Sequence, residues 1–368
     1  MSNPAVNSPE LTTVRGIACV ALVAYHVVGP TSASGMHLPD SSQWHHAMNS
    51  FNFFRMPLFS VISGFVYAGR RVERHFIAEF LKKKSLRLGA PLLFVTAVML
   101  GLRRLAYGDS TSAIDAFGFH YQHLWFIQAL LIIFIGVAVC DSFGRLNSVG
   151  LLCLSLASLV LSQSFDFVSV FSLNGALYLA PFFIFGMILR AEPTILQSRN
   201  YLPVAAWFVA IGFVLQQAGI LGAIMPVGRL SLAAALCGCG AAYAIFAVCP
   251  RIAFLESIGA YSYTIYLWHP IAAASVRLAV NRYTALPSAE EFLLLVAAGL
   301  VVPIIIHRAV ERIPLLSLLI AGIRLPHRRS VKAARLPALV PAHRFNTRSW
   351  SNDNSPVALN ARSWSDVK

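Results

Sequence analysis

Charged residues are scarce in this sequence of 368 residues. Asp, Glu, Lys and Arg make up only 12% of it, whereas 57% of the residues are hydrophobic and the mean hydropathy is +0.67. A water-soluble domain of this length needs far fewer apolar residues to fill its core. The scarcity of charge therefore excludes a set of ordinary soluble domains and indicates burial in a lipid bilayer.

Strict alternation of apolar and polar residues is also missing, and segments of about ten residues with that pattern would mark a membrane β-barrel. The apolar stretches instead approach the roughly 20 residues that a helix needs to cross the hydrocarbon core. Backbone polar groups in lipid must be paired within the protein, and a helix pairs them within its own segment. The sequence accordingly predicts an all-α, multi-pass (polytopic) membrane protein.

Cysteine is sparse and follows no disulfide pattern. All six residues lie in or beside apolar stretches, where a small, polarisable side chain packs well: Cys19, Cys140, Cys153, Cys237, Cys239 and Cys249. Cys237 and Cys239 are two residues apart, so a helix would point them about 200° away from each other. Because they could not hold one ion together, we expect no metal site.

Ten apolar stretches are expected to span the membrane, with ends accurate to about two to four residues. They are 11–30, 51–69, 86–102, 122–140, 149–163, 172–190, 202–220, 227–248, 258–279 and 290–310. A polar N-terminus, residues 1–10, precedes them, and a basic tail, residues 324–368, has too little apolar content to fold alone. We therefore expect a membrane domain over residues 11–323, followed by a disordered tail.

Positive charge is unevenly distributed among the loops, within a net charge of +14. Lys and Arg cluster between Arg70 and Arg87, after the second expected span, and between Arg308 and Arg335, from the end of the tenth span into the tail. Because positively charged loops are retained in the cytoplasm, both termini are expected there. The charge is explained by topology and by membrane lipid headgroups, so nucleic acid is not expected as a partner.

Two ionisable residues lie inside the first span, where their cost in lipid makes them functional candidates. Arg15 and His26 are eleven residues apart, so a helix places them on one face, about 16 Å apart along its axis. With the N-terminus in the cytoplasm, Arg15 lies near the inner surface and His26 near the outer one. Alternatively, Arg15 extends to the headgroups and His26 only satisfies a hydrogen bond in the core.

Five short elements occur in a fixed order along the chain. They are LTTVRGIACVALVAYH from Leu11, FNFFRMPLFSVISGF from Phe51, HLWFIQALL from His123, SIGAYSYTIYLWHP from Ser257 and HRAVERIP from His307. Together they resemble acyltransferase family 3, the integral-membrane O-acyltransferases that modify bacterial surface polysaccharides and exopolysaccharides. The resemblance extends over about residues 11–314, and the order and spacing of the elements make it specific.

The resemblance implies that His26 is the catalytic histidine and that Arg15 is its companion. Lys84 and Arg87 take the positions of an Arg-x-x-Arg pair that handles the acyl donor, together with Arg15. Lys84 keeps a point charge for phosphate but loses the bidentate geometry of arginine. The implied reaction moves an acyl group, most often acetyl, from cytoplasmic acyl-CoA to a glycan hydroxyl outside the bacterial inner membrane.

The chemistry of acyl transfer agrees with these roles. A base must take the hydroxyl proton, and a cation or dipole must stabilise the oxyanion. Histidine titrates near neutral pH, so His26 either takes the proton or accepts the acyl group itself. Both alternatives remain open from the sequence.

Four further residues are candidates for binding the acceptor. Arg55 lies at the outer end of the second span and Asp40 in the first outer loop, whereas His123 and Trp125 lie at an outer membrane edge. Each also has an ordinary explanation, since aromatic and basic residues anchor helices at the interface, and Asp40 is then only a solvated loop residue. Tyr263, Tyr266 and His269 recur at a spacing of three and share one helix face, so we expect them to pack in the core.

Two other functions fit part of the pattern. A secondary transporter would use Arg15 and His26 as a proton or substrate relay, but the internal repeat that many transporters carry is not evident. A lipid-linked saccharide or a peptide is an alternative acceptor to a finished polysaccharide. Proteins of polysaccharide biosynthesis are therefore expected partners.

Overall fold

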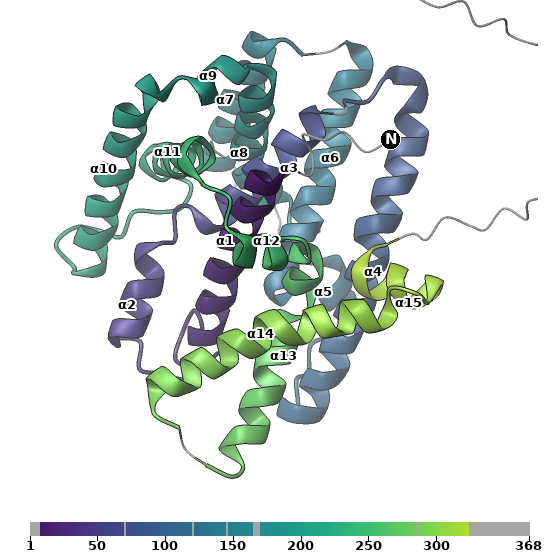
Figure 1. Ribbon diagram of the computed structural model, residues 1–368, viewed down its shortest axis with the longest axis vertical. Coiled ribbons are helices and arrows are strands. Elements are labelled where there is room, and N and C mark those ends of the chain that lie inside the picture. Colours follow the sequence, from purple (N-terminus) through teal and green to yellow (C-terminus); the bar gives the residue numbers. More distant parts are fainter. Residues whose placement is uncertain are drawn as a thin grey trace, which may run out of the picture. The chain divides into compact units, whose positions relative to one another are not determined.

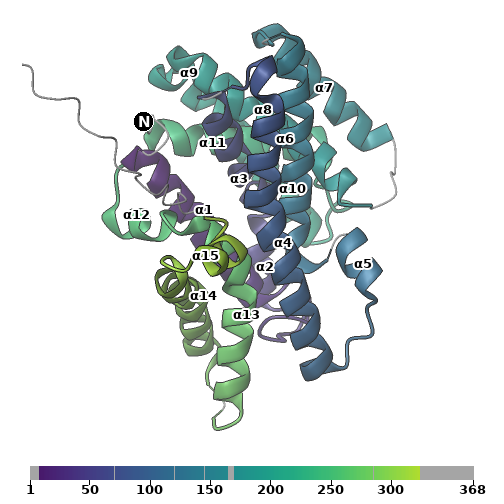
Figure 2. The ribbon, with the colours of Figure 1, turned by 90° about the vertical axis from the view of Figure 1, so that its right-hand side faces the viewer.

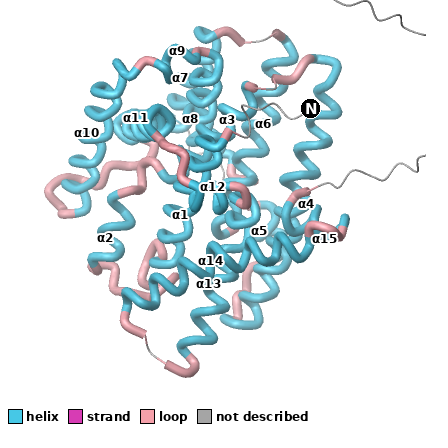
Figure 3. Tube along the Cα trace, in the orientation of Figure 1, coloured by secondary structure: helices cyan, strands magenta, loops and turns pink. Residues whose placement is uncertain are grey.

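The computed structural model describes residues 8–323 except residues 70, 120, 145, 165–169 and 285. Every regular element among these residues is a helix (Figure 3), and extended pairing is confined to one antiparallel bridge between Phe119 and Val170. The prediction of an all-α protein is confirmed. The expected tail, residues 324–368, and residues 1–7 lie outside the described residues.

A helix is present at each of the ten expected spans. These helices are α1 (Pro9–Val28), α3 (Arg55–Ala68), α4 (Ile77–Tyr107), α6 (Trp125–Phe143), α7 (Ser148–Ser164), α8 (Leu173–Ala191), α10 (Leu202–Ile220), α11 (Leu232–Val248), α13 (Ser262–Asn281) and α14 (Ser288–Val310). Short helices connect them: α2 (Gln43–Ser50), η2 (Arg74–Phe76), α5 (Ala113–Gly118), η3 (Gln122–Leu124), α9 (Pro193–Gln197), η4 (Arg199–Tyr201) and α12 (Ala253–Gly259); α15 (Pro314–Ala321) follows α14.

Six of the helical segments are long and apolar enough to cross a membrane. They contain α1, α4, α6, α8, α10 and α14. The other four expected spans are shorter or more polar: α3 has 14 residues, α7 and α11 have 17 each, and α13 has 20 but includes several polar side chains. The length and composition of the six segments are those of a membrane protein.

The first helix, α1, occupies a central place in the described part of the chain and packs against α3, α12, α13 and α14 (Figures 1 and 2). It begins after Ser8, whose side chain accepts a hydrogen bond from the backbone N–H of Leu11. It ends at Gly29, whose φ of 93° is readily adopted only by glycine. These two signals set the register in which α1 carries its functional side chains.

Glycine allows two helix pairs to approach closely. Gly64 on α3 lies against the backbone of Phe183 on α8, and Gly186 on α8 lies against Val61 on α3. The pair α1 and α12 is built in the same way, with Gly16 against Leu255 and Gly259 against Thr12. Such contacts between small residues are a usual means of helix association in membranes.

Candidate active site

Three histidines from separate elements lie beside one another, and we call them the histidine cluster. His26 comes from α1, His123 from η3 and His269 from α13. Their ring centroids are 5.0 Å apart for His26 and His269, 5.3 Å for His123 and His269, and 6.0 Å for His26 and His123. His269 is 1% exposed and His123 6%, whereas His26 is only partly buried. His26 is therefore the member that a substrate can reach.

Hydrogen bonds determine which nitrogen carries the proton in two of these rings. Nδ1 of His269 lies 2.9 Å from the carbonyl oxygen of Ile265 and 3.0 Å from that of Tyr266. Because carbonyl oxygens only accept, this Nδ1 must donate. Nε2 of His123 lies 3.3 Å from the carbonyl oxygen of Leu267 and donates for the same reason. Among the described residues, His26 makes ring contacts rather than hydrogen bonds.

An arginine, Arg55, contacts an aromatic ring that in turn contacts the histidine cluster. The Arg55 guanidinium lies 3.5 Å from the ring centre of Tyr25, and that ring is 5.1 Å from the ring of His26. Arg55 is 4% exposed and donates hydrogen bonds to the Met48 carbonyl and to Oδ1 of Asn52. These contacts hold a positive charge beside His26, where an anion that forms during a reaction would be stabilised.

Trp125 lies near the histidine cluster because it begins α6 directly after η3. It is partly exposed, and the Arg229 guanidinium lies 5.7 Å from its ring and 5.4 Å from the ring of Tyr178. The charges of Arg55 and Arg229 both act on Tyr178. The sequence carried no signal for Arg229 or Tyr178, because both are isolated residues. Tyr178 comes from α8 and Arg229 from the segment between α10 and α11, and only the tertiary structure brings them near Trp125.

Asp40 has a local partner in the loop after α1. Its carboxylate accepts hydrogen bonds from the backbone N–H of Ser32, at 2.6 Å, and from the hydroxyl of Ser32, at 3.2 Å. Both residues are exposed. The carboxylate therefore shapes the loop, and a role in acceptor binding would be additional.

A second group of side chains comes from the N-terminal halves of α1 and α4. Arg15 and Lys84 each lie near enough to Arg87 for their charges to interact. The Lys84 ammonium is 3.7 Å from the ring centre of Phe134, and the Tyr263 hydroxyl donates to the Arg87 carbonyl at 3.2 Å. We call Arg15, Lys84 and Arg87 the cation group. The structure thus joins the three residues that the sequence assigned to the acyl donor.

A buried ion pair lies on the same side of α6 as Lys84. Asp141 is paired with Arg71, with 2.5 Å between Oδ1 and the guanidinium, and its Oδ2 accepts a hydrogen bond of 2.7 Å from the Tyr67 hydroxyl. The Tyr67 ring also contacts Phe134. This network joins the end of α3 to the end of α6 and so supports the surface on which Lys84 rests.

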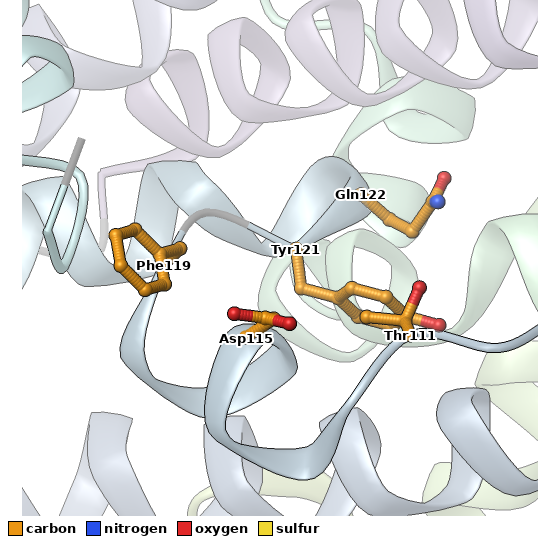
Figure 4. Close-up of a pocket in the computed structure, with 5 residues that line it drawn as sticks. All are labelled: Thr111, Asp115, Phe119, Tyr121 and Gln122. Atoms are coloured by element: carbon orange, nitrogen blue, oxygen red, sulfur yellow. The ribbon is translucent and has the colours of Figure 1, made fainter.

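An open pocket of about 540 Å³ lies beside α5 and the start of η3. Its lining consists of Thr111, Asp115, Phe119, Tyr121 and Gln122 (Figure 4). The polar groups here bond to one another: Ser112 donates to Asp115, and Tyr121 donates to Asp109. Hydrogen bonds from Thr111 and Arg103 hold the pKa of the Asp109 carboxyl well below its usual range. These hydrogen bonds stabilise the loop between α4 and η3.

His, Cys, Asp and Glu do not form a group of three able to hold a metal ion within the part of the chain that the structure describes. Comparison with known proteins gave one finding. A protein-family model described as an acyltransferase domain matches residues 8–308, from α1 to α14, and this range includes the histidine cluster and the cation group. Searches of the curated proteins and of the solved structures gave no match.

Proposed function

Because the chain belongs to the acyltransferase family whose model covers residues 8–308, we propose that it transfers an acyl group, most often acetyl, from acyl-CoA to a glycan hydroxyl across a bacterial inner membrane. His26 is the residue at which the transfer takes place. The acyl-CoA lies against the cation group, and the glycan approaches from the opposite end of α1.

The observation that carries this proposal is the placement of two groups along one helix. Arg15 belongs to the cation group and His26 to the histidine cluster, and eleven residues of α1 separate them, which is about 16 Å. A long donor with phosphates at one end and a thioester at the other matches this arrangement. Lysine and arginine bind phosphate through their charge, while histidine handles the proton of the hydroxyl.

The proposed topology has all ten helices crossing the membrane and both termini in the cytoplasm. Its support is the presence of a helix at each expected span and the basic residues of the loops that follow α3 and α14. In this orientation the cation group faces the cytoplasm, where acyl-CoA is made. The histidine cluster, Arg55 and Trp125 then lie toward the outer surface.

The reaction joins the acceptor oxygen to the acyl carbon and breaks the bond between that carbon and sulfur. In the direct form, a bare nitrogen of His26 takes the hydroxyl proton as the oxygen attacks, and the departing thiolate receives that proton from His26. In the two-step form, His26 first accepts the acyl group and then passes it to the hydroxyl. Arg55 stabilises the oxyanion in either form through its charge.

The acceptor is proposed to contact Trp125, His123, Arg55 and Asp40, with Arg229 beside Trp125. An exposed aromatic ring packs against the apolar face of a sugar, and the arginines donate hydrogen bonds to its oxygens. Either a glycan or a lipid-linked saccharide meets these requirements. Proteins of polysaccharide biosynthesis would supply that acceptor, and membrane lipids surround the helices.

The test is transfer of label from acetyl-CoA to glycan extract of the native host by purified protein. Wild type is compared with His26→Ala and with His45→Ala, a buried histidine outside the cluster. We expect transfer by wild type and by His45→Ala, and loss in His26→Ala. Transfer by His26→Ala at the wild-type rate contradicts the role of His26. Failure of wild type with acetyl-CoA and then with succinyl-CoA contradicts the proposed reaction.

A further inference from the structure

We propose that His269 orients His26 for catalysis by accepting a hydrogen bond from an N–H of His26 through its own Nε2. This inference rests on the proposed function and assigns a positioning residue to it. His26 then has one nitrogen held by His269 and its other nitrogen bare toward the acceptor hydroxyl.

Pro270 determines which nitrogen of His269 is protonated. Proline has no backbone N–H, so the carbonyl oxygen of Tyr266, four residues earlier on α13, loses its usual helical donor. Nδ1 of His269 takes that place, at 3.0 Å, and also lies 2.9 Å from the carbonyl oxygen of Ile265. Since both partners can only accept, Nδ1 carries the proton and Nε2 of a neutral ring is left as an acceptor.

Nε2 of His269 is buried and has no hydrogen-bond partner among the described residues. Most buried polar atoms in folded proteins are hydrogen-bonded, so each exception needs an explanation. The ring is 1% exposed, and a buried acceptor of this kind requires a donor from a neighbouring side chain. The rings in contact with it, those of His26, His123 and Tyr266, are the donors nearest at hand.

The neighbouring side chains leave one candidate for that donor. The N–H of neutral His123 is used on the Leu267 carbonyl, and the Tyr266 hydroxyl donates to the carbonyl of His123. His26 is the remaining ring of the cluster, and its N–H is not used in another hydrogen bond within the described residues. His26 is therefore the available donor to His269.

The geometry permits this hydrogen bond. The ring centroids of His26 and His269 are 5.0 Å apart, which leaves room for a bond of about 3 Å between two facing nitrogens. Catalytic hydrogen bonds are often loose without substrate and shorten in the complex. The ring of His269 cannot rotate to another acceptor orientation without breaking its bonds to α13, so the adjustment falls to His26.

The consequence for the reaction is a defined path for the proton. The hydroxyl proton moves to the bare nitrogen of His26 as the oxygen attacks the acyl carbon, and it then moves to the departing thiolate. Throughout the reaction, the other N–H of His26 keeps its hydrogen bond to Nε2 of His269. The Nδ1–H of His269 likewise keeps its hydrogen bonds to the carbonyl oxygens of α13. A base oriented by a third group is the general arrangement for activating a hydroxyl.

The first experiment compares His269→Phe, which keeps a ring without an acceptor, with His269→Gln, which restores an acceptor oxygen. We expect His269→Phe to lower kcat by about 10²-fold or more, with the KM for acetyl-CoA within about threefold of wild type. The kcat of His269→Gln is expected to be at least about tenfold higher than that of His269→Phe. The matched control is His45→Phe, because His45 is also buried and has an unpartnered Nε2.

Wild-type kcat in His269→Phe overturns the inference. So does a loss in His269→Gln as large as in His269→Phe when both variants bind acetyl-CoA and unfold at the wild-type temperature. The thermal unfolding measurement separates a lost hydrogen bond from a lost fold.

A second measurement does not depend on activity. Solid-state NMR of protein labelled with ¹⁵N-histidine reports which ring nitrogen is protonated, and His26→Ala assigns the His26 signals. We expect one fixed His26 tautomer in wild type and a mixture in His269→Phe. An unchanged His26 tautomer in His269→Phe overturns the inference. If the tautomer changes as expected but wild type transfers no acyl group, the inference stands and only the proposed function has failed.

Discussion

Among individual side chains, Lys84 is partly buried and still has its charge available to a ligand. Its ammonium lies over the Phe134 ring and within reach of the Arg87 charge, and it has no carboxylate partner among the described residues. An aromatic face stabilises a cation without neutralising it. Lys83, the preceding residue, is exposed and paired with Glu79 at 2.5 Å. The two lysines therefore make a matched pair for mutation.

Lys84→Gln is expected to raise the KM for acyl-CoA about tenfold and to change kcat little, because the charge binds the donor phosphates before and during the reaction alike. Lys84→Arg keeps the charge and is expected to remain within a few-fold of wild type. Steady-state kinetics with varied acetyl-CoA measures both. Lys83→Gln is the control, and an equal rise in its KM would show that the effect belongs to the general positive surface.

Between helices, glycine contacts decide how closely α3 approaches α8. A Cβ atom on Gly186 would lie 2.1 Å from the Val61 carbonyl oxygen. Because this oxygen belongs to the backbone, it cannot move away by a change of rotamer. The helices would have to separate, and both carry residues that contact the surroundings of the site. Tyr178 on α8 and Arg55 on α3 are among them.

Gly186→Ala is expected to destabilise the protein by about 1–3 kcal/mol through overpacking. The measurement is the thermal unfolding midpoint in detergent. Gly136→Ala on α6 is the control, because a Cβ atom there meets no atom within 4 Å and alanine favours the helix. An unfolding midpoint of Gly186→Ala equal to that of Gly136→Ala would mean that α3 and α8 pack less closely than described.

Across the entire chain, the number of membrane crossings decides which groups face which compartment. The six long apolar segments alone and the full set of ten helices predict different sides for the same loops. The short helices α3 and α7 are the ones whose membrane crossing most needs to be tested. If each crosses the membrane, the cation group and the histidine cluster face opposite compartments.

Single cysteines at exposed loop positions test this in a variant without the native cysteines. With ten crossings, Thr31→Cys and Ser110→Cys are labelled by an impermeant maleimide added outside, and Asn200→Cys reacts only after the membrane is opened. If α3 does not cross, Thr31 and Ser110 lie on opposite sides. If α7 does not cross, Ser110 and Asn200 lie on the same side. Either result would overturn the proposed topology.

The fold was largely predictable from the sequence because hydropathy acts locally. Each apolar stretch must form a helix in lipid whatever its neighbours are, so the approximate positions of the ten helices at the expected spans follow from the composition of successive windows. The ends of the helices depart from this pattern: α3 has 14 residues because it begins only at Arg55, whereas the expected span began at residue 51. Such an end depends on contacts with another element and cannot be read from hydropathy.

The sequence by itself determined that this is a helical membrane protein. It made Arg15 and His26 candidates through their spacing, and Lys84 and Arg87 through the family resemblance. Only the tertiary structure decided which side chains meet. His269 was expected to pack in the core, and it is buried, but it packs on His26 and His123. Spacing along a chain specifies the face of one helix, whereas contact between three helices depends on their packing, which no single window of sequence contains.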